Sequence, residues 1–134
     1  MLEFSVIQTR GFRNVTDDGR ITGFQVPVRL TGYRGAWLSQ LRPATVTVDG
    51  VKYGGDQITW TVGGKTYEQS ELSTRGDVHW SSLEPAILTM KEPGGLALGI
   101  HEVNVEFQMS SSYLPPRIDL RDKGGEPRTL VLVR

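Results

Sequence analysis

The chain has 134 residues and carries 15 basic and 15 acidic side chains, so its formal net charge is zero. A chain of this length is expected to form one domain, residues 1–134, that can bury a core without disulfides or metals. A neutral chain without basic clusters has no electrostatic footprint for nucleic acid or an anionic membrane. The absence of cysteine excludes disulfide scaffolds, thiolate zinc sites and cysteine nucleophiles.

The first residues, Met1 to Ser5, lack the basic segment and the long apolar core of a signal peptide. No apolar run approaches the length that a membrane-spanning helix needs. Together with the lack of cysteine, these features predict a cytoplasmic protein.

Apolar and polar residues alternate with a period of two along most of the chain, which predicts half-buried strands. Pro27 cannot donate to a ladder, so its strand is expected at a sheet edge or with a bulge at that position. Residues 37–41 are expected to hold one irregular helical turn. In chain order, the expected strands are 12–15, 21–30, 45–48, 51–53, 58–62, 65–67, 86–90 and 100–109.

Glycine-containing turns separate these strands. Asp49-Gly50 and Gly63-Gly64 each predict a two-residue hairpin turn, while 17–19 and 92–95 separate two further strand pairs. The count of about eight mostly antiparallel strands predicts an all-β fold, a single β-sandwich of the jelly-roll or immunoglobulin-like type.

The last part of the chain, residues 110–134, has a different composition. Pro115-Pro116 stops any ladder, and the residues from 117 to 128 are polar and charged. Residues 129–133 are apolar enough for one more strand, which is expected at a sheet edge.

The sequence contains two histidines, His79 and His101. By alternation His101 shares a face with Val103, which favours a structural role in which backbone groups satisfy its ring nitrogens. His79 lies between Asp77 and Trp80 and is a candidate proton carrier. No second acid, base or nucleophile is spaced near it, so a structural role is favoured here too.

Metal binding and independent catalysis are not expected of this chain. The two histidines form no metal-binding motif. The carboxylates in turns serve backbone geometry there. These carboxylates are Asp17, Asp18, Asp49 and Asp56.

The loop at residues 31–41 contains two glycines and carries large aromatic side chains and an arginine. Such side chains are favoured anchors of protein interfaces. The alternative is that the loop plugs the end of the core, and the sequence leaves both open. A second candidate interface segment, Tyr113-Leu114, follows the strand expected at 100–109. The alternative for this segment is that it only terminates the strand. The candidate interface residues are Tyr33, Arg34, Gly35, Trp37, Leu38 and Ser39, with Tyr113 and Leu114.

Six elements of the chain, in order, resemble the β subunit of the bacterial C-glycoside deglycosidases. His79 stands where an arginine is expected before the tryptophan of an Asp-Val-x-Trp element. The six elements are Phe-Arg-Asn-Val at 12–15, Gly-Arg-Ile-Thr-Gly-Phe at 19–24, Tyr-Arg-Gly-Ala-Trp-Leu-Ser at 33–39, Val-Asp-Gly at 48–50, the segment 91–103 with its Pro-Gly-Gly-Leu, and Ser-Tyr-Leu-Pro at 112–115.

This resemblance implies that the chemistry lies in another chain. In that family a large α subunit, similar to sugar-phosphate isomerase (β/α)8 barrels, holds a divalent metal, usually manganese. It acts on 3-oxo-C-glycosides, because the ketone makes the C2 proton acidic and the C1 aglycone, such as a flavonoid, leaves by β-elimination. The present chain would then be a non-catalytic subunit of a carbon–carbon lyase, without a cofactor of its own. His79 and Trp80 are its candidates for proximity to substrate.

A second reading of the residues is a stand-alone carbohydrate- or ligand-binding sandwich. Trp37, Trp60 and Trp80 would then supply a platform on which sugar rings stack. Trp60 fits the buried face of its strand, which leaves at most two tryptophans for such a platform.

Overall fold

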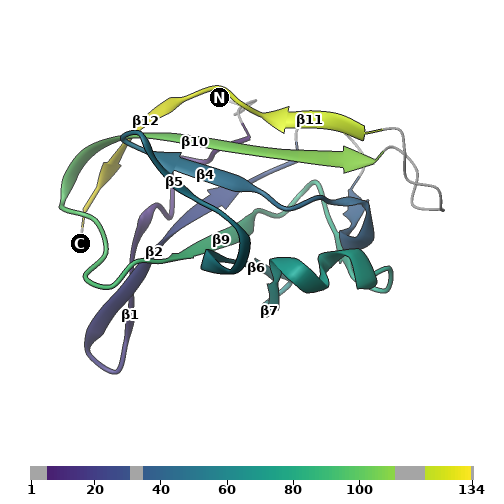
Figure 1. Ribbon diagram of the computed structural model, residues 1–134, viewed down its shortest axis with the longest axis horizontal. Coiled ribbons are helices and arrows are strands. Elements are labelled where there is room, and N and C mark those ends of the chain that lie inside the picture. Colours follow the sequence, from purple (N-terminus) through teal and green to yellow (C-terminus); the bar gives the residue numbers. More distant parts are fainter. Residues whose placement is uncertain (1–5, 31–34, 111–119, 134) are drawn as a thin grey trace.

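The alternating sequence folds into two antiparallel sheets that face each other across one core (Figure 1). The computed structural model describes residues 6–30, 35–110 and 120–133. The first sheet has the order β1 (Arg13–Asp17), β2 (Arg20–Val28), β9 (Ala86–Lys91), β6 (Ile58–Val62) and β7 (Lys65–Glu68). The second has the order β11 (Leu120–Gly124), β10 (Gly99–Ser110), β4 (Thr45–Val48) and β5 (Val51–Tyr53), and β12 (Arg128–Leu132) also pairs with β10.

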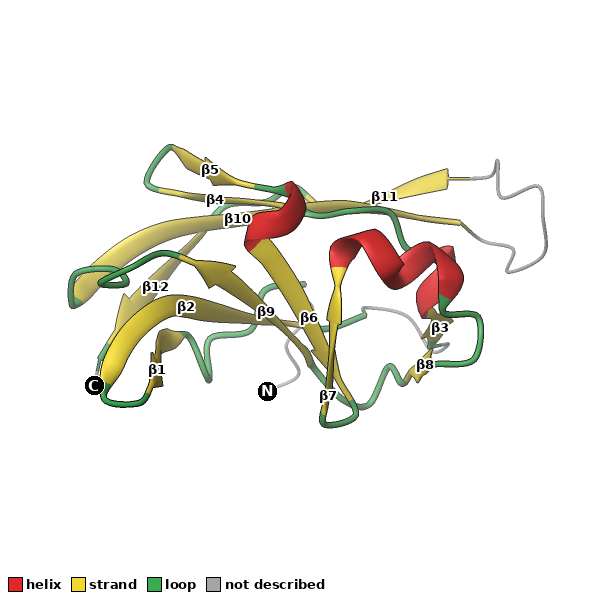
Figure 2. Cartoon of the chain, turned by 60° about the horizontal axis from the view of Figure 1, so that its bottom comes forward, coloured by secondary structure: helices red, strands yellow, loops and turns green. Residues whose placement is uncertain are grey.

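Short elements complete the fold, most of them at one end of the sandwich (Figure 2). The two-residue strands β3 (Ala36–Trp37) and β8 (His79–Trp80) pair with each other. The 3-10 segments are η1 (Leu38–Gln40), η2 (Gly55–Gln57) and η3 (Gln69–Thr74). Among the described residues, no helix combines the length and the hydropathy that a membrane crossing requires.

The predicted all-β sandwich is confirmed, and every strand pair in the described residues is antiparallel. The described residues contain twelve strands: the eight expected, the expected last strand, and three that were not expected, β3, β8 and β11. β3 and β8 are too short to show an alternating pattern, and β11 is mostly polar. The predicted hairpins have positive φ at both turn residues, as primed turns require. Their turn residues are Asp18 and Gly19 (51° and 77°), Asp49 and Gly50 (50° and 85°), and Gly63 and Gly64 (60° and 84°).

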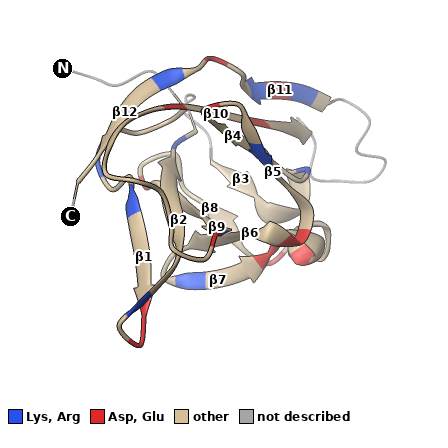
Figure 3. Cartoon of the chain, turned by 60° about the vertical axis from the view of Figure 1, so that its left-hand side comes forward, with Lys and Arg blue, Asp and Glu red and all other residues tan. Residues whose placement is uncertain are grey.

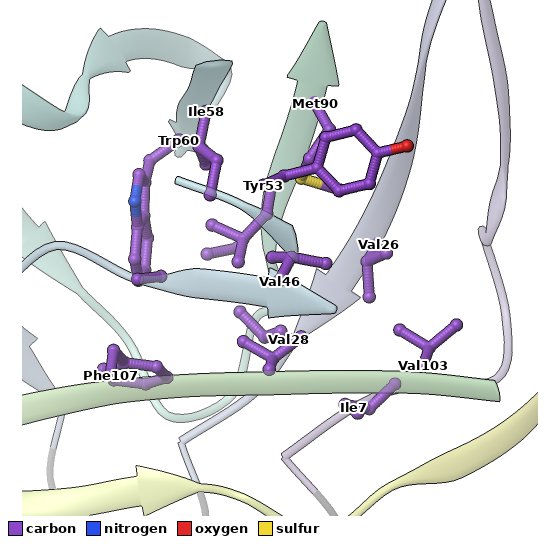
Figure 4. Close-up of a cluster of buried hydrophobic side chains, with 14 of the residues drawn as sticks. Ile7, Val26, Val28, Val46, Tyr53, Ile58, Trp60, Met90, Val103 and Phe107 are labelled. Carbon is purple, nitrogen blue, oxygen red and sulfur yellow. The ribbon is translucent and has the colours of Figure 1, made fainter. Parts of the chain in front are cut away.

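The core lies between the inner faces of the two sheets (Figure 4). Trp60 of β6 meets Phe107 of β10 edge-on, with ring centroids 5.5 Å apart. Phe24 of β2 meets Tyr53 of β5 in the same way at 5.1 Å. Each large side chain buried here stabilises the fold by about 1.5–3 kcal/mol relative to exposure. Alternation therefore placed the core residues of the long strands on the correct face.

Pro27 lies in the interior of the first sheet, where β2 pairs with β9 through Pro27 and Ile87. Its carbonyl accepts a hydrogen bond from the amide of Gln8 at 3.0 Å, on the side away from β9. The registered pairs of β1 with β2 end at Gln25. The proline nitrogen therefore faces a position beyond the end of β1, and the ladder to β9 loses no donor. The prediction of an edge strand or of a bulge at Pro27 is wrong, because β2 lies between β1 and β9 and its ladder to β9 continues through Pro27 without a register shift. The side of Pro27 that lacks a donor nevertheless lies outside the β1 ladder.

The end of the chain runs antiparallel along β10. β12 pairs with residues 99–103, and β11 pairs with residues 106–110. The amide of Gly125 donates to the carbonyl of Val105 at 2.9 Å between the two strands. A strand thus lies at Arg128–Leu132, where residues 129–133 were expected, and β11 occupies part of the segment that was expected to be only polar tail.

Candidate functional site

The short β3–β8 ladder brings the loop candidates next to His79 and Trp80. Ala36 pairs with Trp80, and Trp37 pairs with His79. A Cβ atom on Gly35 would lie 2.2 Å from the carbonyl oxygen of Trp80 and 2.4 Å from Cε1 of His79. Only glycine therefore permits this close approach of the two segments.

Trp37 and His79 form an aromatic pair on the surface of this end. Their ring centroids are 5.0 Å apart and the rings are inclined by 72°. Trp37 is half-buried and His79 is exposed, so both rings retain surface that a partner can contact. Tyr33 and Arg34, which precede this pair in the sequence, lie outside the described residues.

Three other candidates from the same region have their side chains buried within the chain itself. Leu38 and Trp80 are completely buried, and Ser39 is almost so. The indole of Trp80 donates to the carbonyl of Glu84 at 2.9 Å. For Leu38 the structure thus favours the core-plug alternative, and a contact of its side chain with another protein is not available in this conformation. Tyr113 and Leu114 lie outside the described residues.

The tryptophans do not form a common stacking platform. Trp60 and Trp80 are completely buried and meet edge-on, with centroids 5.8 Å apart and planes at 75°. The indole of Trp60 donates to Oε1 of Gln69 at 2.8 Å. Of the three tryptophans, only Trp37 keeps exposed ring surface, so the structure offers no support for a sugar-binding row of indoles.

His101 occupies the opposite end of β10 and joins three segments. Its Nδ1 lies 2.6 Å from Oδ2 of Asp49, and its Nε2 lies 2.6 Å from the carbonyl oxygen of Ala97. The other carboxylate oxygen of Asp49 accepts the amide of Glu102 at 2.8 Å. The ring of Phe12 meets the imidazole edge-on at 6.1 Å. The structural role predicted for His101 agrees with these contacts, although one partner is a carboxylate and not a backbone group.

Both partners of His101 accept hydrogen bonds, so the doubly protonated ring satisfies both. Burial lowers the pKa of His101, but the bonds to Ala97 and Asp49 outweigh it and the net pKa is raised above 6.5. The pKa of Asp49 is lowered from 3.8, first by the hydrogen bond from the Glu102 amide and then by His101. Both pKa shifts favour the charged forms of the two side chains, and their contact fastens the β4–β5 turn to β10.

Asn14 of β1, in the first sheet, binds the loop between β9 and β10, which also contains Ala97. Its side-chain amide donates to the carbonyl of Leu96 at 2.9 Å and accepts the amide of Leu96 at 2.9 Å. No local sequence pattern indicates this contact, because the two residues are far apart in the chain. Asn14 and His101 together fix the loop between β9 and β10.

A groove of about 600 Å³ opens beside this loop. One of its described lining residues, Arg13, is charged, and several others are aliphatic. The lining consists of Arg13, Asn14, Thr16, Ile21, Gly94, Leu96, Ala97, Leu98 and Val133. Across the described part of the chain, no three His, Cys, Asp or Glu side chains are close enough to share a metal ion.

Residues 2–113 match a protein family described as the C-glycoside deglycosidase beta subunit. The chain belongs to this family. It is 51% identical over 120 residues to a C-glycoside deglycosidase beta subunit of Eubacterium cellulosolvens, which covers 87% of this chain and 80% of the relative. A protein of the same description from Arthrobacter globiformis is 32% identical over 100 residues, covering 75% of this chain and 74% of the relative. A 3'-dehydrocarminate deglycosidase beta subunit from Microbacterium sp. is 33% identical over 95 residues, covering 70% of each chain.

Membership of the C-glycoside deglycosidase beta subunits confirms the resemblance based on the sequence motifs. Among the described residues, three of these motifs meet at one end of β10 and a fourth lies near its other end. The elements at 12–15, 48–50 and 91–103 supply Asn14, Asp49 and His101, which meet around the loop between β9 and β10. The described part of the element at 33–39, residues 35–39, lies near the far end, because Nε2 of the following residue, Gln40, donates to the carbonyl of Ser110 at 2.9 Å. A beta subunit implies a complex with a different subunit, so both ends are candidate contact surfaces.

Proposed function

We propose that this chain is the non-catalytic β subunit of a C-glycoside deglycosidase, a carbon–carbon lyase of carbohydrate metabolism that acts on 3-oxo-C-glycosides. The observation that carries the proposal is the family match over residues 2–113, together with 51% identity to a relative of that description. The placement of both histidines supports it. The ring nitrogens of His101 are both hydrogen-bonded within the sandwich, and the ring of His79 packs against Trp37.

The chemistry is assigned to an α subunit of the (β/α)8 barrel type. Its expected reaction is removal of the C2 proton, which the 3-oxo group acidifies, followed by β-elimination of the aglycone from C1. We assign the divalent metal, expected to be manganese, to that subunit, as the resemblance to the family implies. We place the complex in the cytoplasm.

The contribution of this chain is to assemble with and stabilise the α subunit. The proposed contact at the β3–β8 end uses Trp37 as its main anchor, with Tyr33 and Arg34 from the preceding segment and Tyr113 and Leu114 after β10. Leu38 and Ser39 are buried beneath this surface and hold its backbone in place. His79 is the exposed candidate for proximity to substrate, and Trp80 supports it from the core.

The direct test is co-expression of this chain with the α subunit, followed by an assay of aglycone release from a 3-oxo-C-glycoside. We expect the two chains to co-purify and the complex to turn over substrate. The isolated small subunit should melt cooperatively and show no turnover. Turnover by the purified small subunit alone, or failure of the two chains to associate, would contradict the proposal.

A further inference from the structure

Exposed aliphatic side chains gather around the groove at the His101 end of β10. Ile100 and Val131 are directly opposite each other in the β10–β12 ladder, and they are 73% and 57% exposed. Leu98 and Val133, which are 53% and 62% exposed, lie two residues further along the same two segments and line the groove. Ile21 of β2, which also lines the groove, is 41% exposed. These five side chains are called the terminal patch below.

The patch rests on a fixed support. His101 holds the carbonyl of Ala97 at 2.6 Å, and Asn14 holds both backbone groups of Leu96. Leu98 therefore follows a segment that is anchored to both sheets. Figure 3 shows β12 without charge over most of its length, in contrast to β11, which carries both basic and acidic residues. A pre-organised apolar surface of this kind loses little conformational entropy when a protein covers it.

We propose that the terminal patch is a docking surface for the α subunit, separate from the Trp37 surface. This inference rests on the proposed function and adds to it the place of a second contact. β10 has 12 residues, so the two surfaces are separated by roughly 36 Å of strand at about 3.3 Å per residue. Figure 2 shows β3 and β8 at one end of the molecule and β12 at the other.

The exposed area supports an interface with another protein. From their exposed fractions, the five residues expose on the order of 500 Å² in total, within the roughly 300–600 Å² of the largest apolar patch on a typical monomer, which is often a functional one. Each partner in a standard interface contributes roughly 800 Å², so the patch supplies more than half of one side. Aliphatic groups without exposed aromatic rings do not suit sugar stacking.

The chemistry of the occupant follows from the charge of the groove. Arg13 is the one charged side chain among its described lining residues, and the rest offer aliphatic or backbone surface. The matching surface of the α subunit is therefore apolar at its centre and carries a carboxylate at its rim, where the guanidinium of Arg13 can form a bidentate pair.

The test compares two valines of equal exposure in the same sheet. Val131 lies in the patch, while Val51, also 57% exposed, lies in β5 at the opposite edge of the sheet. Val131→Lys should weaken binding to the α subunit by roughly tenfold or more, as expected for an interface hot spot. Val51→Lys should leave the affinity unchanged. The measurement is a titration of each variant into the α subunit, with the melting temperature of each isolated variant as a control.

A double variant guards against loss of the fold. Ile100→Glu with Val131→Lys places opposite charges at directly opposed positions, which keeps the strand pair together while the patch becomes polar. It should bind at least as weakly as Val131→Lys. Amide exchange on the wild-type chain adds a measurement without mutation, because residues 98–101 and 129–133 should gain protection when the α subunit is added.

The possible outcomes distinguish the inference from the proposed function. If the wild-type chain binds the α subunit and both patch variants bind equally well, the inference is overturned while the proposed function stands. If the isolated wild-type chain dimerises through the patch and the α subunit binds elsewhere, a second copy is the occupant and the inference is again overturned. If the wild-type chain does not bind the α subunit at all, both the proposed function and the inference fail.

Discussion

Replacing His101 with alanine should destabilise the sandwich in a pH-dependent way. The variant loses the imidazole donors to Asp49 and Ala97 and the edge contact with Phe12. A hydrogen bond to a charged group contributes about 1.5–3 kcal/mol, but Asp49 and Ala97 are both exposed and can be rehydrated. We therefore expect a loss of about 1–2 kcal/mol in the free energy of unfolding near pH 6.

The pH dependence follows from the directions of the two pKa shifts. The pKa of His101 is raised above 6.5 in the folded chain, so its stabilisation is complete below that pH and is lost as pH rises through the folded value. The pKa of Asp49 is lowered from 3.8, so its contribution is present above that pH and is lost as pH falls through the folded value. The difference between wild type and His101→Ala should thus be largest between these limits and shrink in alkaline solution.

Urea unfolding at a series of pH values measures this difference. His79→Ala serves as the matched control, since it removes the exposed histidine and leaves the pair with Asp49 intact. Its unfolding curve should keep the pH dependence of the wild type. An equal loss of stability for His101→Ala at about pH 6 and about pH 9 would refute the charged pair, and a loss well below about 0.5 kcal/mol at both would refute the structural role of the histidine.

Four further predictions follow from the contacts described. Gly35→Ala should abolish the β3–β8 pairing, seen as loss of amide protection there, because its Cβ would lie 2.2 Å from the Trp80 carbonyl oxygen. Gln69→Leu should cost about 2–4 kcal/mol in thermal or urea unfolding, because it leaves two buried N–H donors without their acceptor. Trp37→Ala should weaken assembly with the α subunit by about 2 kcal/mol or more in a titration, with little change in the melting temperature of the isolated chain. His79→Ala should leave the single-turnover rate of the assembled complex within about tenfold, a barrier change near 1.4 kcal/mol; a loss of several orders of magnitude would give it a catalytic role.

Local patterns in the sequence carried enough information for the longer strands and the hairpin turns of the sandwich, but not for β3, β8 or β11. Hairpins depend on neighbouring residues, so Asp49-Gly50 and Gly63-Gly64 determine both the turn and the register of the flanking strands. The alternation at 103–107 likewise determined which side chains of β10 face the core. The family motifs could be read in the same way, because they are short and occur in order along the chain.

Tertiary structure alone decided which loop residues are buried and which remain available to a partner. Leu38, Ser39 and Gln40 are consecutive and all buried, because the turn at η1 breaks the period of two, while Trp37 just before them keeps exposed surface. The bond between His101 and Asp49 and the pairing of Ile100 with Val131 both join distant segments. Such contacts depend on how the sheets stack and on where the final strand pairs, and these are properties of the assembled sandwich that no local pattern contains.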